Sequence, residues 1–438
     1  MIEKISELTQ NIYPTLIEWR RDLHKYAESG WVEFRTASMV ASKLSDWGYD
    51  VLTGRDVIKE EARMGVPAQS FLEQQEKRAL AQGADPKWVA RFSGGYTGVV
   101  GILDTGRPGP TIGYRVDMDA LDILESKAAD HLPVKEGFVS ANEQMMHACG
   151  HDAHTSIGLG VAYILSQIKD QLTGRMKLIF QPAEEGVRGA KSMVEAGVVD
   201  DVDVFIAIHI GFGADFGQLI CGDPGFLATT KLDVTYTGKA AHAGEKAEEG
   251  KNALLAAATA SLNLHAISRH SEGKSRINVG MLQAGSGRNI IPNTAHLKIE
   301  TRGETSTINE YMYQRAVQII KSAADMYEVE SKIEIVGAAQ TSEPSKELLD
   351  YIREQAANVP DIQTILETRT AGGSEDATYM MTRVKEKGGL AAYIIFGTTL
   401  AAGHHNERFD IDETVMATAV KTLALCASNI EKLPDTVN

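Results

Sequence analysis

The sequence predicts an α/β protein with two domains. The larger has a mostly parallel sheet covered by helices on both faces, and an α+β domain of ferredoxin-like type is inserted into it. A chain of 438 residues is too long for one ordinary core. Short β-rich runs alternate with helical patterns along much of it, as in parallel α/β sheets. In the middle of the chain, the order of the expected strands and helices changes to β-α-β-β-α-β. We therefore expect a large domain from 1–225 and 339–438, with 226–338 as the insert.

The first 225 residues begin with helices and continue as strands that alternate with helices. Apolar residues recur at helical spacing over 3–27 and again over 36–47. Residues 56–92 are charged and mostly helical in pattern, and we interpret them as an accessory excursion. The expected strands are 97–103, 111–116, 175–180 and 202–210, and the expected helices between them are 154–168 and 188–196.

The residue pattern of the inserted segment predicts four strands and two helices. In chain order they are a strand at 231–237, a helix at 252–267, strands at 276–282 and 295–301, a helix at 308–327 and a strand at 332–336. After this segment, strands and helices alternate again. It predicts a helix near 345–357, a strand at 391–396 and a closing helix at 413–430.

Composition and charge restrict the class of function. With 43% hydrophobic and 24% charged residues, the chain has the composition of a soluble globular protein. A net charge of −15 argues against nucleic acid and anionic membranes as partners, because both need a basic face. The three cysteines form no disulfide framework, and the N-terminus carries charge where a signal peptide needs an apolar core. We expect a cytoplasmic protein.

Three histidines, one cysteine and one aspartate lie close together in the run His147–His154. A Cys-x-His spacing just ahead of a helix can direct a sulfur and an imidazole nitrogen at one point. Such ligand sets suit Zn and neighbouring first-row metals. A competing interpretation makes Cys149 a nucleophile paired with a base. That mechanism leaves the acidic and imidazole clusters elsewhere in the chain unexplained.

Four further clusters of polar residues lie at the ends of predicted strands, where open α/β sheets place their sites. They are Asp117 with Asp119, Glu184 with Glu185, His209, and the loop 403–407. Each alone has an ordinary explanation, such as a solvated surface, a helix cap or a core histidine. Their coincidence indicates a metal hydrolase, in which one glutamate binds metal and its neighbour takes a proton from water.

These clusters, with several others, resemble the co-catalytic metallopeptidase family of aminoacylases, carboxypeptidase G and indole-acetyl-amino-acid amidohydrolases. The motifs that carry the resemblance are Arg-Val-Asp-Met-Asp-Ala-Leu (115–121), His-Ala-Cys-Gly-His-Asp-Ala-His (147–154), Pro-Ala-Glu-Glu-Gly (182–186), Gly-Lys-Ala-Ala-His-Ala-Gly (238–244), Gly-Ser-Glu-Asp-Ala (373–377) and His-His-Asn-Glu-Arg-Phe-Asp (404–410). Within the family, the run 24–37 and the stretch 56–92 are most similar to the branch that hydrolyses p-aminobenzoyl-glutamate.

The resemblance implies a metal-dependent amidohydrolase that cleaves N-acyl or N-aroyl amino acids at two divalent ions, Mn or Zn. It implies five metal ligands: Cys149, His151, Glu185, His209 and His405. Cys149 would be shared between the ions, and His404 is the alternative to His405. Glu184 would be the general base, oriented by Asp119. Asp117 stands where the carboxypeptidase branch has histidine, so no ligand is expected there.

Three residues of the inserted segment complete the implied site. His242 would stabilise the oxyanion at the site of a partner subunit, and Asn289 and Arg302 would contact the substrate carboxylate. A guanidinium suits that task because it can hold a carboxylate by two hydrogen bonds. Apart from the resemblance, His242 is an ordinary loop residue and Arg302 a salt-bridge partner. The family also implies a homodimer, or a hetero-oligomer with a related B subunit.

Two other functions fit the same sequence. One is a general aminoacylase or small dipeptidase of the same family. The other is a non-catalytic homologue that binds a ligand.

Overall fold

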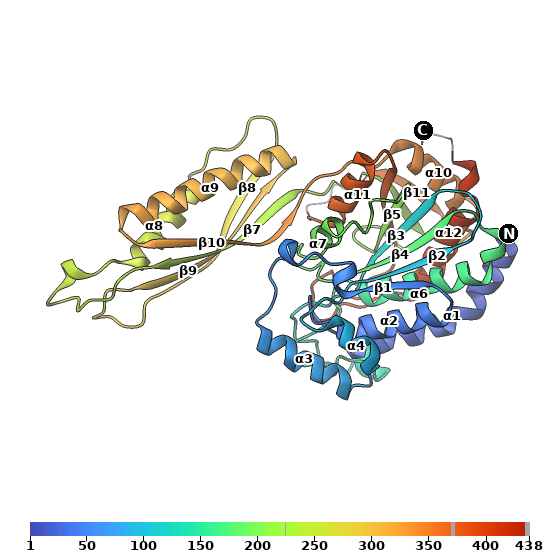
Figure 1. Ribbon diagram of the computed structural model, residues 1–438, viewed down its shortest axis with the longest axis horizontal. Coiled ribbons are helices and arrows are strands. Elements are labelled where there is room, and N and C mark those ends of the chain that lie inside the picture. Colours follow the sequence, from blue (N-terminus) through green and yellow to red (C-terminus); the bar gives the residue numbers. More distant parts are fainter. Residues whose placement is uncertain (224, 369–372, 434–438) are drawn as a thin grey trace. The chain divides into compact units, whose positions relative to one another are not determined.

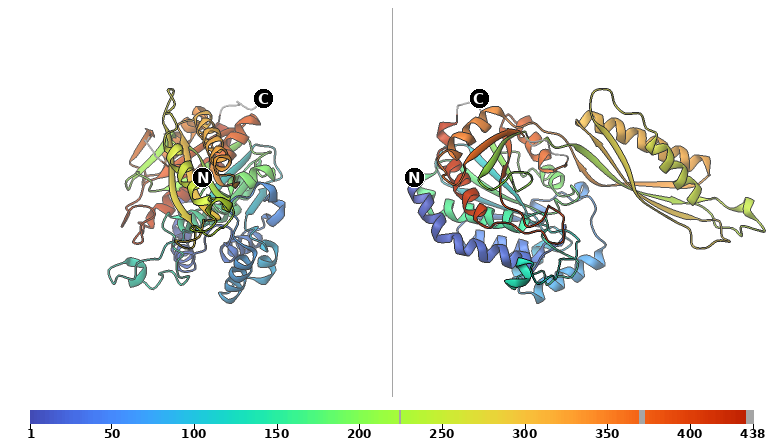
Figure 2. Two further views of the ribbon diagram at one scale, coloured as in Figure 1. Left: turned by 90° about the vertical axis from the view of Figure 1, so that its left-hand side faces the viewer. Right: turned by 180° about the vertical axis from the view of Figure 1, so that it is seen from behind.

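The computed structural model describes residues 1–223, 225–368 and 373–433, and it divides into two compact units (Figures 1 and 2). The large unit contains Met1–Gly225 and most of the chain after Ser342. The small unit contains Phe226–Thr341 with a short piece that ends at Glu375. Each unit has its own sheet.

The large unit is built on an eight-stranded sheet of order β1-β2-β4-β3-β5-β12-β6-β11. Its strands are β1 (Asp50–Thr53), β2 (Val99–Asp104), β3 (Thr111–Asp117), β4 (Arg175–Gln181), β5 (Val204–Ile210), β6 (Gln218–Asp223), β11 (Thr364–Thr368) and β12 (Leu390–Phe396). Its helices are α1 (Ile2–Lys25), α2 (Phe34–Asp46), α3 (Gln69–Ala81), α4 (Pro86–Phe92), α5 (Leu132–Lys135), α6 (His151–Gln167), α7 (Ala190–Glu195), α10 (Lys346–Ala356), α11 (Ala377–Glu386) and α12 (Thr414–Ser428).

The parallel character of this sheet is concentrated in its centre. Strands β4, β3, β5 and β12 are parallel neighbours, and β2 and β6 lie antiparallel beside them. The central strands are almost entirely buried, as expected for strands covered by helices on both faces. Helix α6 is also buried nearly all round and packs with α1, α12 and β3.

The register of the central strands brings their carboxyl ends to one edge. Asp117 at the end of β3 is paired with Gln181 at the end of β4, and His209 in β5 is paired with Ile395 in β12. The polar loops that follow these strands therefore start side by side. This is the edge at which the sequence predicted a site.

The small unit has the ferredoxin-like order β10-β7-β9-β8, with every pair antiparallel. Its elements are β7 (Ala228–Thr237), α8 (Ala253–His265), β8 (Ser275–Ala284), β9 (Thr294–Gly303), α9 (Ser306–Met326) and β10 (Glu330–Ala339). Apolar side chains of β7 and β9 pack with α8 and α9 into one core. The predicted fold class is confirmed in both units.

The accessory stretch 56–92 forms two helices, α3 and α4, that pack on α2. Ahead of them, the Lys59 N–H donates to the Ser192 carbonyl, and the Trp31 indole donates to the Met64 carbonyl. The stretch is thus anchored to the large unit near α7. Among the described residues, no helix combines the length and apolarity needed to cross a membrane.

Candidate metal centre and active site

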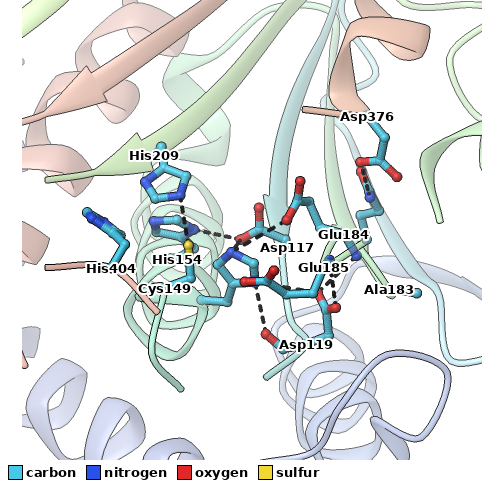
Figure 3. A network of polar contacts seen from close by, with 12 residues as sticks. Asp117, Asp119, Cys149, His154, Ala183, Glu184, Glu185, His209, Asp376 and His404 are labelled. Carbon is cyan, nitrogen blue, oxygen red and sulfur yellow. Dashed lines mark hydrogen bonds and ion pairs between the residues drawn. The ribbon is translucent and has the colours of Figure 1, made fainter. Parts of the chain in front are cut away.

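Six side chains of the large unit converge at the carboxyl edge of the central strands, although they come from four distant segments. Figure 3 shows Cys149, Glu184, Glu185 and His209 among them. The six are Cys149, His151, Glu184, Glu185, His209 and His405. The first two lie where a loop enters α6, the glutamates follow β4, His209 lies in β5, and His405 lies in the loop after β12. These are the predicted base and the five predicted metal ligands.

The six residues form three overlapping groups, and in each group the ligand atoms lie within 4.8 Å of one another. The groups are Cys149 with His151 and His209, Cys149 with Glu185 and His405, and His151 with Glu184 and Glu185. Cys149 Sγ lies 3.5 Å from His209 Nε2, and His405 Nε2 lies 3.5 Å from Glu185 Oε1. Cys149 belongs to two of the groups, which is the position expected of a shared ligand.

The donor atoms fit a divalent metal ion. Within the part of the chain that the structure describes, the buried His151 Nε2 has no hydrogen-bond partner, and His405 Nε2 lies 3.5 Å from the buried Glu185 Oε1. His151 Nδ1 donates to the Asp119 carbonyl at 2.8 Å, and His209 Nδ1 donates to the Ile210 carbonyl at 2.7 Å. In its neutral form, each ring would therefore present the lone pair of its other nitrogen, as metal-binding histidines do. Thiolate, imidazole and carboxylate donors together suit zinc and manganese.

The ionisable groups of this cluster perturb one another. Hydrogen bonding to Cys149, and next to Glu185, raises the pKa of His405 to about 10. Burial, and next Glu185, raises the pKa of the Cys149 thiol. Burial, and next the nearby His154, lowers the pKa of His209 well below its ordinary value. Perturbed neighbouring groups in a buried cluster are typical of functional sites.

The two adjacent histidines after β12 have different surroundings. His404 Nε2 lies 3.3 Å from the Ile210 carbonyl, and its ring packs against Phe409. It belongs to none of the ligand groups found among the described residues. His405 has a left-handed backbone, with φ of 65°, and its N–H donates to the Ala148 carbonyl at 2.7 Å. This contact ties the His405 loop to the Cys149 loop, and the geometry favours His405 as the ligand.

Asp117 and His154 lie beside the cluster but are held by other partners. His154 Nδ1 donates to Asp117 at 2.6 Å, and its Nε2 accepts the Ile210 N–H at 3.0 Å. Both ring nitrogens of His154 are thus engaged. Asp117 also accepts from Arg115 at 2.8 Å. Although burial opposes ionisation, His151 and Arg115 hold the pKa of Asp117 well below its ordinary value.

Asp119 reaches the glutamates through their backbone. Its two carboxylate oxygens accept the N–H groups of Glu184 at 3.0 Å and Glu185 at 2.9 Å. Its own carbonyl accepts from His151. Asp119 therefore joins the predicted base to a predicted ligand. That Asp119 orients Glu184 remains a prediction, and the hydrogen bond from the Glu184 N–H is the contact through which it would act.

One contributor was not recognised in the sequence. Arg20 of α1 is fully buried and pairs with Asp152 at 2.9 Å and Asp410 at 2.6 Å. It thus connects the segment of His151 with the segment of His405. Its position on the apolar stripe of α1, between the buried Leu16 and Leu23, was the signal available.

The three predicted residues of the small unit lie at two ends of one strand. The His242 segment pairs with the Asn289–Ile290 loop, since the Ala243 N–H donates to the Asn289 carbonyl. Arg302 lies near the far end of β9 and pairs with Glu300 at 3.1 Å. At about 3.4 Å per residue, about 27 Å of strand separates Arg302 from the Asn289 loop. One substrate molecule cannot contact both Asn289 and Arg302 of the same chain.

The profile of the family described as "Peptidase family M20/M25/M40" matches residues 113–429. The chain is 56% identical to an indole-3-acetyl-aspartic acid hydrolase of Enterobacter agglomerans, over 97% of this chain and 98% of that protein. It is 55% identical to one of the subunits of p-aminobenzoyl-glutamate hydrolase from Escherichia coli, over 98% of each chain. A crystal structure of an aminobenzoyl-glutamate utilization protein from Klebsiella pneumoniae has 50% identity and a TM-score of 0.86, covering 97% of this chain and 98% of that one.

Proposed function

Because the chain belongs to peptidase family M20/M25/M40 and is a hydrolase of that family, we propose that it cleaves p-aminobenzoyl-glutamate to p-aminobenzoate and glutamate. The observation that carries this proposal is the cluster of metal-type donors beside Glu184, which is largely buried and open on the side of His405. The substrate comes from the names of two relatives that match nearly the full chain.

A second substrate, indole-3-acetyl-aspartate, is favoured by the relative at 56% identity. The two substrates share an aromatic acyl group and an acidic amino acid. We therefore define the proposed substrate class as aromatic acyl conjugates of glutamate or aspartate. A general aminoacylase or small dipeptidase of the family would instead accept other acyl groups.

Two divalent ions, Mn or Zn, are the cofactors that we propose. Cys149, His151, Glu185, His209 and His405 would hold them, with the Cys149 sulfur shared. When bound, such ions polarise the amide carbonyl and lower the pKa of water.

The proton transfers of the reaction are assigned to side chains of the protein. Glu184 is a carboxylate with only 9% exposure, and its Oε2 lies 4.0 Å from His151 Nε2. We assign it as the general base that takes a proton from the attacking water. The C–N bond breaks as Glu184 gives this proton to the leaving amine. His242 would donate a hydrogen bond to the oxyanion that forms between these steps.

Phe212 offers a surface for the aromatic acyl group. Its ring centroid lies 5.2 Å from that of His209 and 5.5 Å from that of His404, and its side chain is partly exposed. Its backbone has φ of 35°, which is rare for a bulky residue and concentrates at functional sites. A benzoyl or indole ring could stack there at offset or edge geometry.

We propose that the active assembly contains a second protein chain, either in a homodimer or in a hetero-oligomer with a related B subunit. The name of the Escherichia coli relative describes it as one subunit of its hydrolase. Strand β8 is an edge of the small sheet, and Leu262 of α8 is 77% exposed. The distance between Asn289 and Arg302 supports the idea that His242 and Asn289 serve the site of a partner subunit.

The experiment combines metal removal with one substitution. The protein is stripped with a chelator and reloaded separately with Mn²⁺ and Zn²⁺. Hydrolysis is then measured on p-aminobenzoyl-glutamate, indole-3-acetyl-aspartate, hippurate and acetyl-glutamate. We expect activity that depends on metal, prefers the first two substrates, and falls by about 10³-fold or more in Glu184→Ala.

Several outcomes would contradict this proposal. Unchanged turnover in Glu184→Ala would exclude the assigned base. Activity that survives metal removal but is lost in Cys149→Ser would favour a thiol nucleophile. Bound metal without turnover of any substrate would favour a ligand-binding protein, and a preference for acetyl-glutamate would favour a general aminoacylase.

A further inference from the structure

The turn that carries Glu184 and Glu185 has an unusual backbone. Ala183 has φ of 50° and Val187 has φ of 59°, on either side of Gly186 at 87°. A left-handed backbone is uncommon for residues other than glycine, and it is a genuine outlier for a β-branched valine. Such conformations persist only where the surrounding structure holds them. Something outside the turn must therefore hold it.

Three buried carboxylates accept the backbone N–H groups of this turn, and Figure 3 shows Asp119 and Asp376 among them. We call Glu33, Asp119 and Asp376 the carboxylate cradle. The five hydrogen bonds are Ala183 N–H to Glu33 Oε1 at 2.8 Å, Glu184 N–H to Asp119 Oδ1 at 3.0 Å, Glu185 N–H to Asp119 Oδ2 at 2.9 Å, Gly189 N–H to Asp376 Oδ2 at 3.0 Å and Ala190 N–H to Asp376 Oδ2 at 2.9 Å. The bonds hold both ends of the turn and its middle.

Two cradle members have further contacts that fix them in place. Glu33 has no exposed surface, and its Oε2 accepts the Thr97 hydroxyl at 2.6 Å. Asp376 Oδ1 accepts the Gln181 amide at 2.8 Å. The segment before Glu33 also packs closely, because a Cβ on Gly30 would lie 3.0 Å from Ala183 Cα. The cradle is thus a rigid support.

We propose that Glu33 and Asp376 are positioning residues for hydrolysis, which fix the directions of Glu184 and Glu185 by holding the backbone between them. This inference rests on the proposed function of the two glutamates. The adjacent carboxylates point to different partners, Glu184 to His151 and Glu185 to His405. Both directions depend on the path of the turn. A displacement of about 1 Å can cost about 100-fold in rate.

The inference gives a role to two motifs that the proposed chemistry leaves without one. Glu33 lies in the opening run 24–37, and Asp376 lies in Gly-Ser-Glu-Asp-Ala (373–377). Neither residue belongs to the groups that contain Cys149 or His151, although Asp376 has a carboxylate oxygen within 4.8 Å of those of Glu184 and Glu375. Both act on the turn through hydrogen bonds to its backbone.

The test compares Glu33→Leu and Glu33→Gln with a matched control, Glu28→Leu. Glu28 is equally buried and accepts two backbone N–H groups, those of Arg35 at 3.1 Å and Thr36 at 2.8 Å, at the start of α2. Each purified variant is reloaded with metal. The measurements are bound metal per chain, the thermal unfolding temperature, and kcat and KM on the substrate that wild type hydrolyses.

For Glu33→Leu we expect kcat to fall about 10- to 100-fold, with KM and bound metal close to wild type. Glu33→Gln should keep most of kcat, because its amide oxygen can accept the Ala183 N–H while its amide N–H faces the Thr97 hydroxyl. Glu28→Leu should lower the unfolding temperature but keep kcat per metal-loaded chain. A purely structural role for Glu33 predicts that Glu33→Leu behaves like Glu28→Leu.

A second readout does not depend on activity. Loaded with Co²⁺, the protein should show visible absorption bands that report the ligand geometry around Cys149 and Glu185. We expect altered bands in Glu33→Leu and wild-type bands in Glu33→Gln and Glu28→Leu. If wild type hydrolyses no acyl amino acid, the proposed function fails while these spectra still test the cradle.

Asp376→Asn covers the case in which Glu33→Leu does not fold. Its amide nitrogen would face the Gln181 amide that now donates to Asp376, so the contact should be lost. We expect the same signature of lower kcat, retained metal and altered Co²⁺ bands. Folded, metal-loaded Glu33→Leu or Asp376→Asn with wild-type kcat and wild-type bands would overturn the proposal for that residue.

Discussion

Replacing Arg20 by methionine should destabilise the large unit and loosen the metal centre together. The guanidinium is fully buried and lies 2.9 Å from Asp152, 2.6 Å from Asp410 and 3.3 Å from Glu413. Methionine keeps much of the apolar contact but removes the charge. The substitution therefore leaves Asp410 without its buried cation, whereas Asp152 keeps the buried His24 ring, whose Nδ1 lies 2.8 Å away.

The magnitude follows from this burial. Removing one partner of a buried ion pair costs about 3–5 kcal/mol, because the remaining charge stays in a poorly solvated place. Asp152 and Asp410 are 0% and 3% exposed, so we expect a loss in this range. Arg21 is the control. It pairs with the same Glu413 at 2.9 Å but is 30% exposed, so Arg21→Met should cost less than about 1 kcal/mol.

All four tryptophans of the chain lie in the large unit, at positions 19, 31, 47 and 88. Urea unfolding followed by tryptophan fluorescence therefore reports the free energy of unfolding of that unit. Metal affinity is measured in parallel, and Mn²⁺ should bind more weakly because Asp152 follows the predicted ligand His151. Adding Asp410→Asn to Arg20→Met should recover part of the stability. A loss below about 1 kcal/mol, or an equal loss in Arg21→Met, would refute this reasoning.

Three further predictions concern the substrate, the pH dependence and the partner. Phe212→Leu should raise KM for aromatic acyl substrates about 3- to 10-fold and leave acetyl-glutamate unchanged, and an equal effect on both substrates would exclude a stacking role. Burial, and next Asp119, raises the pKa of Glu33 to about 8 from 4.5. The folded protein then binds a proton that the unfolded chain releases, so wild-type stability should fall as pH rises from about 5 to 8. Glu33→Gln lacks this loss, and unfolding temperatures that change in parallel for the two proteins would contradict the assignment. Inactive Glu184→Ala and inactive His242→Ala should together restore about a quarter of wild-type activity when equal amounts exchange protomers in a homodimer. Half of the dimers are then mixed, and one of the two sites in each mixed dimer has both residues intact. No recovery after confirmed exchange would place His242 in the site of its own protomer.

The sequence was sufficient to predict the fold class, because that prediction depends on local periodicity. Long apolar strands such as 111–116 and 175–180 lie close to their observed positions, and the β-α-β-β-α-β order predicted the small sheet. Strands β1, β6 and β11 were not predicted. Strands β1 and β11 are short and lie at the edges of the sheet, where burial leaves a weak pattern in the sequence.

The sequence also determined the kinds of residue at the site, since carboxyl ends of parallel strands must share an edge. It could not determine which atoms meet. The distinction between His404 and His405 depends on a left-handed backbone and a contact to Ala148, and neither has a local signature. The free Nε2 of His151 likewise depends on a hydrogen bond to Asp119, 32 residues away.

Only the tertiary structure showed the supports of the site. Arg20 resembles an ordinary charged residue in the sequence, and Glu33 and Asp376 lie in motifs to which the sequence assigned no role. The importance of all three comes from complete burial against distant partners. The spacing of apolar residues indicates which face of a helix or strand is buried, but it does not indicate which residues that face contacts. The sequence alone thus determined which types of functional side chain lie at the carboxyl edge of the sheet. Packing between segments far apart in sequence decided the direction of each functional side chain.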